Sequence, residues 1–274
     1  MLWWAFSLGC QLEGTPVVDA RGGGVAYWPA HSRTAVEGAI EAAFSSLEID
    51  LTPTADGQWV GQGGATWQDC IDTRTNLPAE PAAVVEWDQD ATQLLRCGGT
   101  PQPEWPNALV VAEAPLTLQG LIQLVRESDL SEQRIHLHLR SADLPSVAQL
   151  FDVWAPAELP NALHVSADEL VTLEAVETEA RRRNLEVHST LRLFDEMDNS
   201  APAVGPLVNT KLWEQLQMQE ADGLALPAFA WSRQRLRRAQ EEGIAAMALD
   251  ADDPSTWSIG LDSVLTAFPG DLVP

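Results

Sequence analysis

The stretch LEIDLTPTADGQWVGQGG, residues 47–64, decides the fold class of this chain. Leu47, Ile49 and Leu51 alternate with Glu48 and Asp50, and this period of two predicts a strand with both carboxylates on one face. Two acids that share a face directed at a core are costly to bury unless positive charge compensates them. The sequence therefore predicts a buried pair of carboxylates with a cationic partner, followed by a glycine-rich turn region.

Strand-like and helix-like runs alternate along the rest of the chain. The predicted strands are residues 16–22, 45–51, 134–140, 162–166, 185–191, 223–228, 244–250 and 263–268, and the predicted helices are residues 32–44, 117–128, 146–155, 167–183, 210–220 and 232–243. Such alternation is typical of a parallel sheet with crossover helices, and eight strands predict an α/β fold of the closed (β/α)8 barrel type, the TIM barrel. The turn-rich residues 55–112 are predicted to form an insertion after the second strand, within one domain that spans residues 16–274.

The composition excludes one class of partner. The chain has 274 residues with 16 Lys and Arg against 40 Asp and Glu, which gives a net charge of −24. Nucleic-acid phosphates require clustered positive charge, so we expect no nucleic-acid partner. The expected partner is an anionic small molecule or a protein of unknown identity.

The first residues, 1–15, resemble a bacterial lipoprotein signal. They begin MLWWAFSLGC, a short apolar run that ends at Cys10, and no basic residue precedes the run. A start codon upstream of Met1 would explain that departure. The resemblance implies lipidation of Cys10 and a place in the bacterial cell envelope, lipid-anchored or periplasmic, with membrane contact through the lipid anchor only. An ordinary apolar first strand is the alternative.

Cys70 and Cys97 are the two cysteines that remain when Cys10 is set aside. Two cysteines are the right number for one disulfide in an oxidising compartment, so we expect a Cys70–Cys97 bridge. Two free buried cysteines are the alternative.

Several motifs, in order and at matching distances, resemble those of the glycerophosphodiester phosphodiesterases. These are TIM barrels of the phospholipase C-like type that cleave phosphodiesters with a divalent metal and two histidines. Glu48-Ile49-Asp50 resembles the family's Glu-x-Asp metal motif and lies at the family's distance from Pro29. The other matches are Asp56-Gly57, PLTLQGLIQLV at 115–125 and GLDSVLTAFP at 260–269.

The resemblance fails where the family keeps its acid–base groups. The family's His-Arg-Gly is here Ala20-Arg21-Gly22, its His-Asp is Gly63-Gly64, and its Glu-x-Lys is His138-Leu139-Arg140. The resemblance thus implies a degenerate barrel that lacks both catalytic histidines. Our hypothesis is a catalytically impaired or inactive barrel that serves as a ligand-binding or scaffold lipoprotein of the envelope. The alternative is an active phosphoric diester hydrolase or lyase with a rearranged acid–base site.

The remaining polar residues give candidate roles. Arg21 and Arg140 are expected either to neutralise the two acids or to bind a phosphate or another anion. His31, near the replaced Pro-Glu-Asn-Thr motif of the family, and His138 are the candidates for acid–base work. Glu48 and Asp50 with His138 are a candidate set for a weakly bound divalent metal (Mn, Zn, Mg or Ca). A histidine among the ligands favours Mn²⁺ or Zn²⁺ over Mg²⁺ or Ca²⁺.

Overall fold

Eight parallel strands close into a barrel in the computed structural model. The structure describes residues 16–63, 66–67, 70–79, 82–100, 107–128, 133–140, 144–193, 210–249, 251–252 and 260–267. The strands are β1 (Val17–Ala20), β2 (Ser46–Pro53), β7 (Arg134–Leu139), β8 (Leu163–Ala167), β9 (Val187–Arg192), β10 (Gly223–Pro227), β11 (Ala245–Leu249) and β12 (Ser263–Thr266). They pair in the order β1-β12-β11-β10-β9-β8-β7-β2, and β1 pairs with β2 to close the barrel. The predicted (β/α)8 fold is confirmed.

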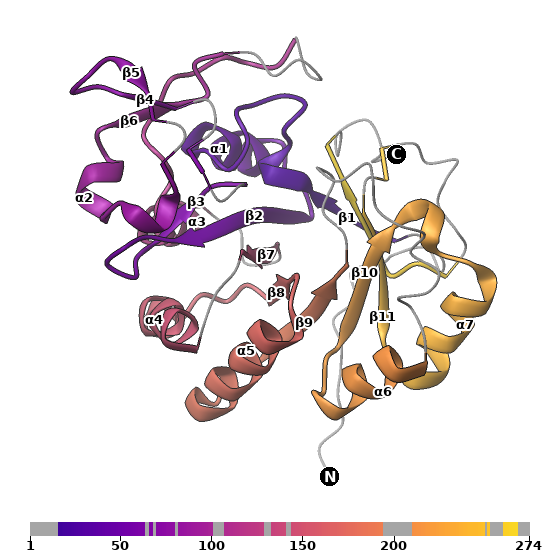
Figure 1. Cartoon of the computed structure of the whole chain (residues 1–274). Coiled ribbons are helices and arrows are strands. Elements are labelled where there is room, and N and C mark those ends of the chain that lie inside the picture. Colours follow the sequence, from indigo (N-terminus) through magenta and orange to yellow (C-terminus); the bar gives the residue numbers. More distant parts are fainter. Residues whose placement is uncertain are drawn as a thin grey trace.

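Helices on the outside connect the strands (Figure 1). They are α1 (Arg33–Glu41), α3 (Leu118–Glu127), α4 (Leu144–Trp154), α5 (Leu170–Arg183), α6 (Thr210–Met218) and α7 (Arg233–Glu242), with short 3-10 turns η1 (Arg21–Gly23), η3 (Ala155–Ala157) and η4 (Ala228–Ala230). Ser32, Thr117 and Ser232 cap helices α1, α3 and α7, because each hydroxyl accepts a hydrogen bond from a backbone N–H of the first turn. The predicted and observed element boundaries differ by a few residues at most.

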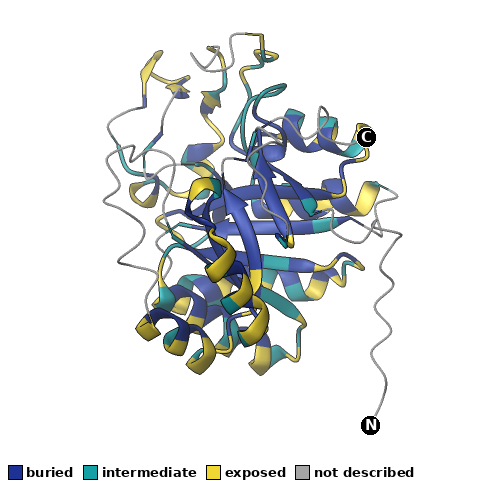
Figure 2. Ribbon diagram, turned by 90° about the vertical axis from the view of Figure 1, so that its right-hand side faces the viewer, coloured by how far each residue is buried: buried dark blue, intermediate teal, exposed yellow. Residues whose placement is uncertain are grey.

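The alternation along β2 separates two environments. Leu47, Ile49 and Leu51 belong to the apolar cluster that includes residues of α1, α3 and α4 outside the barrel. Glu48 and Asp50 therefore face the barrel interior, where both are buried. Figure 2 shows the strands as the most completely buried layer of the molecule. The fold thus places two acids in a closed interior, as the sequence pattern predicts.

The chain between β2 and α3 builds a small structure beside the barrel. Strand β3 (Trp59–Gly61) pairs antiparallel with β2, and β5 (Leu77–Pro78), β4 (Cys70–Asp72) and β6 (Leu95–Cys97) form a separate sheet (Figure 1). The 3-10 turn η2 (Val84–Glu86) and the short helix α2 (Gln89–Thr92) complete it. A disulfide joins Cys70 to Cys97, which are paired residues of β4 and β6. No helix of the described residues has the length and apolarity of a transmembrane span.

Candidate functional site

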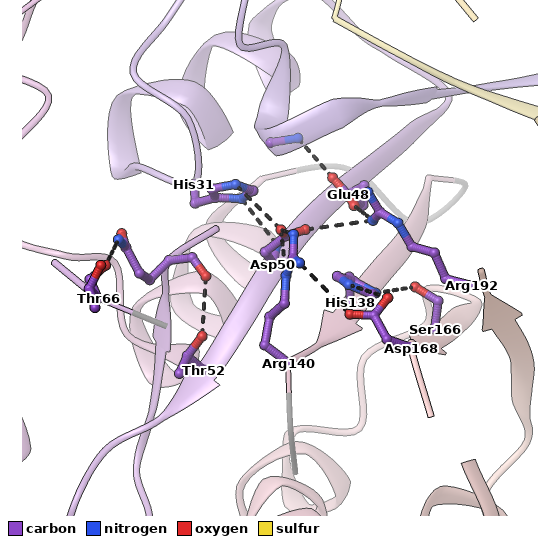
Figure 3. A network of polar contacts seen from close by, with 12 residues as sticks. His31, Glu48, Asp50, Thr52, Thr66, His138, Arg140, Ser166, Asp168 and Arg192 are labelled. Atoms are coloured by element: carbon purple, nitrogen blue, oxygen red, sulfur yellow. Dashed lines mark hydrogen bonds and ion pairs between the residues drawn. The ribbon is translucent and has the colours of Figure 1, made fainter. Parts of the chain in front are cut away.

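The charged side chains and the histidine that meet at the barrel mouth come from four neighbouring strands and from one loop. Glu48 and Asp50 lie on β2, Arg140 follows β7, Asp168 follows β8, and Arg192 ends β9. The loop before α1 adds His31. Because the carboxyl ends of all barrel strands meet at one face, these residues converge on the barrel mouth (Figure 3). The mouth is where barrels of this kind bind their ligands.

Glu48 is completely buried and has two described donors. Arg192 Nη1 donates to Glu48 Oε1 at 2.9 Å, and the backbone N–H of Gly22 donates to Oε2 at 2.9 Å. Burial and the neighbouring Asp50 carboxylate raise the pKa of Glu48 to about 8, against the opposing charge of Arg192. The raised pKa favours a proton on this pair of acids near neutral pH, on the Glu48 side. The cationic partner of Glu48 is Arg192 rather than the expected Arg21 or Arg140.

Asp50 lies between two guanidinium groups. Arg140 donates to Asp50 Oδ2 from Nη2 at 2.8 Å and from Nε at 3.2 Å, and Arg192 Nη1 lies 4.0 Å from Asp50 Oδ1. Figure 3 shows the two arginines approaching Asp50 from different sides. Burial alone would raise the pKa of Asp50, but the neighbouring His31 and His138 rings and the two guanidinium groups outweigh it and hold the pKa well below its usual range. With Glu48 protonated, the four side chains carry one net positive charge.

His31 fills the space beside Gly63. Its backbone has a φ of 56°, a left-handed conformation that is uncommon outside glycine. A Cβ atom on residue 63 would lie 2.9 Å from His31 Nε2, and one on Gly22 would lie 3.3 Å from His31 Cε1. Any side chain at position 63 would therefore collide with the imidazole. The ring of His31 therefore lies beside position 63, where the family that the sequence resembles has a histidine.

The hydrogen bonds of His31 assign its tautomer. The backbone N–H of Asp50 donates to His31 Nδ1 at 3.0 Å, so the lone pair of Nδ1 is engaged and the proton of the neutral ring lies on Nε2. Nε2 lies 3.9 Å from Asp50 Oδ2. Burial, with the charges of Arg140 and Arg21, lowers the pKa of His31 to about 4, although the Asp50 carboxylate opposes the shift. His31 is thus a neutral hydrogen-bond donor near pH 7, with no free lone pair for general-base work.

His138 belongs to a buried hydrogen-bonded series of side chains. Its Nδ1 lies 2.9 Å from Ser166 Oγ, and its Nε2 lies 3.4 Å from Asp168 Oδ1. Ser166 Oγ also lies 2.8 Å from His136 Nε2. Burial lowers the pKa values of both histidines, so both are neutral near pH 7. Asp168 is the partly exposed neighbour of His138 and lies 3.8 Å from Arg140.

The candidate metal ligands do not fit a divalent cation. Arg192, Arg140 and the Gly22 N–H already donate to the oxygens of Glu48 and Asp50, and both ring nitrogens of His138 face Ser166 and Asp168 instead. Within the part of the chain that the structure describes, no three His, Cys, Asp or Glu side chains are grouped as a metal site. The expected set of Glu48, Asp50 and His138 is therefore not assembled.

Two residues of this site were not among the predicted site residues. Arg192 lies one position beyond the predicted strand 185–191, on the same face as His188 and Thr190. Asp168 continues the face of His164 and Ser166 beyond the predicted strand 162–166. Extending both alternations by one step would have found them. Of the other predicted residues, Arg21 is half-buried in the turn after β1, whereas Cys10 lies outside the described residues.

Comparisons with known proteins agree on the fold. The sequence matches no protein-family model and no curated protein. The structure is similar to that of a phosphodiesterase from Oleispira antarctica solved with the product sn-glycerol-3-phosphate, with a TM-score of 0.73 and 16% identity over 94% of this chain and 95% of that chain. It is also similar to the glycerophosphodiester phosphodiesterase of Thermotoga maritima, with a TM-score of 0.63 and 14% identity over 93% and 96% of the two chains.

A protein from Silicibacter pomeroyi assigned as a glycerophosphoryl diester phosphodiesterase superposes with a TM-score of 0.75 and 16% identity, over 94% of this chain and 91% of that chain. At such identities the likeness establishes the fold. The chain therefore has the glycerophosphodiester phosphodiesterase-like TIM-barrel fold, in agreement with the resemblance seen in the sequence.

Proposed function

We propose that this barrel binds a small phosphate-bearing anion at its mouth and does not cleave phosphodiesters by a two-histidine route. The observation that carries the proposal is the state of His31, the imidazole that fills the space beside Gly63. Its Nδ1 accepts the Asp50 N–H at 3.0 Å, so its Nε2 presents a proton rather than a lone pair. A fixed neutral donor can bind an anion, but it cannot take a proton from an attacking hydroxyl group.

The charges of the mouth support anion binding. Arg140 and Arg192 face only one ionised acid of the pair at neutral pH, because burial and Asp50 raise the pKa of Glu48 to about 8. Arg140 is partly accessible, and its planar guanidinium suits the oxygens of a phosphate. Arg21 follows β1 at the same face of the barrel. The bound sn-glycerol-3-phosphate of the Oleispira antarctica phosphodiesterase suggests a glycerol phosphate as the first ligand to try.

Calorimetric titration with sn-glycerol 3-phosphate tests this proposal. We expect binding to the wild type and a loss of about 2 kcal/mol of binding free energy in Arg140→Gln, in the range for a hydrogen bond to a charged group. Arg33→Gln is the matched control, since Arg33 is an exposed arginine on α1 that pairs with Glu37. Equal loss in both variants, or no binding to the wild type, would contradict the proposal.

An active enzyme is the second candidate, and the His138–Asp168 contact favours it. Asp168 is partly exposed at the mouth, and His138, with Ser166 behind it, is placed to exchange a proton with it. Hydrolysis of glycerophosphodiesters should be assayed with Ca²⁺, Mg²⁺ and Mn²⁺. We expect no turnover above that of an Asp168→Asn variant. Robust turnover that Asp168→Asn abolishes would establish the rearranged enzyme and reject the binding protein.

We also propose that the protein is lipid-anchored at Cys10 in a bacterial envelope. The apolar run before Cys10 and the disulfide between Cys70 and Cys97 support an oxidising, exported location. A scaffold role toward a protein partner is compatible with this location. Mass spectrometry of protein from the native envelope is expected to show a lipid-modified Cys10 at the amino terminus. An unmodified chain that still begins at Met1 would count against export.

A further inference from the structure

The space between the two buried acids contains the end of an arginine. Arg192 Nη1 lies 2.9 Å from Glu48 Oε1 and 4.0 Å from Asp50 Oδ1. The side chains of Arg192 and Glu48 are 3% and 0% exposed, and that of Asp50 is 6% exposed. Figure 3 shows the guanidinium directed at both carboxylates. A positive charge that belongs to the chain thus lies where two carboxylates converge.

Arg192 reaches this position across the barrel. In the sheet order, β7 and β8 lie between β9, which carries Arg192, and β2, which carries the acids. Arg192 therefore does not pair with the acids along the sheet. Its long side chain reaches them through the barrel interior, from the last residue of β9. The guanidinium is thus buried inside the mouth, as a bound ion would be, whereas a surface ion pair would be exposed to water.

The resemblance to metal-dependent phosphodiesterases implies a divalent cation between acids spaced as Glu48 and Asp50 are. That cation does not fit here, because its two charges would lie within a few ångströms of a buried guanidinium. Even with both acids ionised, Arg140 and Arg192 already balance them one for one. A further divalent charge would be buried without compensation, which is strongly unfavourable.

We infer that Arg192 is a built-in cation that takes the place of the metal ion in this barrel. Its charge is permanent, so it faces the two acids whether or not Glu48 holds a proton, and it holds their carboxyl groups together without any dissociable ligand. The mouth is consequently assembled in the absence of divalent metal and is insensitive to chelators. This inference concerns the charge between the acids, and it holds whether or not glycerol phosphate is the ligand of the mouth.

Removing the guanidinium should uncover a metal site. In Arg192→Ala and Arg192→Gln the oxygens of Glu48 and Asp50 lose this cation, and carboxylate oxygens are the ligands that hard cations prefer. Binding of Ca²⁺ and of Mn²⁺ is measured by calorimetry and by thermal shift. We expect no binding to the wild type up to the highest metal concentration tested, and dissociation constants in both variants at least roughly tenfold below that concentration, the lower end of the effects seen when metal-site surroundings change.

Arg140→Gln is the matched control. It also removes a positive charge from Asp50, but it leaves Arg192 between the acids. A general electrostatic effect would improve metal binding in all three variants, whereas a vacated site improves it only in the two variants of Arg192. Equal gains in Arg140→Gln would therefore overturn the inference.

Folding of the variants is a readout as well. If Arg192→Ala is unfolded without metal because Glu48 has lost its partner, Ca²⁺ or Mn²⁺ should restore its folded circular-dichroism spectrum. The inference is overturned if the wild type itself binds either ion tightly, or if neither ion binds or refolds the two Arg192 variants. Failure of glycerol phosphate to bind the wild type would reject the proposed function alone, since these measurements contain no phosphate ligand.

Discussion

The barrel interior has two unlike halves. On β10, β11 and β12 the interior is mainly apolar, with Ser263 as a polar exception, and Ala225, Met247, Leu249 and Leu265 form a cluster of their own. On β2, β7, β8 and β9 the interior is polar and ionisable, and its members include Glu48, Asp50, His136, His138, Ser166, Thr190 and Arg192. Both halves are buried, yet only the second has to match every charge with a partner.

The difference shows how the fold and the site are kept separate. The apolar half is stabilised by burial and packing, which depend on side-chain size and not on a particular partner. The polar half is stable only as a set, because removing one member of a buried ion pair leaves the other uncompensated. We therefore expect single substitutions in the polar half, and not those in the apolar half, to weaken ligand binding. Only in the polar half should a second substitution restore the stability that the first one removes.

The largest expected effect is that of Arg192→Met. It leaves Glu48 buried without its cation, which costs about 3–5 kcal/mol of unfolding free energy at a pH where Glu48 is ionised in the wild type. The cost should be larger near about pH 9 than near about pH 6, because the variant must then either hold a proton on Glu48 or bury its charge unpaired. Urea unfolding at the two pH values measures both quantities.

The double variant Arg192→Met with Glu48→Gln is its control. Replacing both members of a buried ion pair by neutral groups is often neutral for stability, so most of the loss should be recovered. No recovery in the double variant would mean that the size of the Arg192 side chain matters more than its charge, and the two halves would then differ less than proposed.

Leu265→Ala is the corresponding test of the apolar half. Leu265 is completely buried, and its truncation is expected to cost about 2–5 kcal/mol through lost burial and a cavity. No second substitution across the barrel should rescue it, and the affinity for glycerol phosphate should stay unchanged. A large loss of affinity in this variant, at a temperature where it is folded, would show that the two halves are coupled.

The fold could be predicted because it depends on repeated local patterns. The alternation of Leu47, Ile49 and Leu51 with two acids survives in β2, and the other seven strands lie within a few residues of their predicted positions. Periodicity of this kind is decided by which face is buried, and that information is local in the sequence. The outward faces of the strands were therefore readable without any knowledge of tertiary contacts.

The partners within the site could not be predicted, because they depend on contacts across the barrel. Glu48 and Arg192 are 144 positions apart, and Arg21 and Arg140 were equally reasonable partners from the sequence. The position of His31 beside Gly63 was also unreadable, since it depends on a left-handed backbone at residue 31 and on the absence of a side chain at residue 63. Sequence identified the acids and one cation that neutralises them, Arg140 beside Asp50, but not Arg192 beside Glu48.

A smaller effect is the pH dependence of the stability that comes from His31, which lies at the mouth beside Asp50. Burial lowers its pKa in the folded state to about 4 from the ordinary value of 6.5. The unfolded chain then binds more protons below pH 6.5, so His31 destabilises the fold progressively as the pH falls from 6.5 to about 4, by about 3 kcal/mol in all. Above pH 6.5 the histidine contributes no pH dependence.

His31→Gln isolates this contribution, because the other histidines are unchanged. The stability of the wild type relative to the variant should decline across that acidic range and stay constant above it. In nitrogen-15 NMR spectra, His31 should keep its proton on Nε2 and show no titration near pH 6.5. A ring that titrates there would be free to act as an acid–base group, and the rearranged enzyme would become the better proposal.

The smallest expected effect is that of Gly63→Ala, which tests whether His31 needs the space beside that glycine. The added Cβ would lie 2.9 Å from His31 Nε2 and 3.6 Å from Asp50 Oδ2, closer to the ring than a normal contact. The ring cannot move away without losing the hydrogen bond from the Asp50 N–H, so we expect a loss of about 1–3 kcal/mol of stability and weaker binding of glycerol phosphate. Gly99→Ala is the control, because its Cβ would meet only Ala112 Cβ at 3.4 Å. If Gly63→Ala behaves like Gly99→Ala in unfolding and in titration, the imidazole is mobile, and the donor that we assign to the mouth is not fixed there.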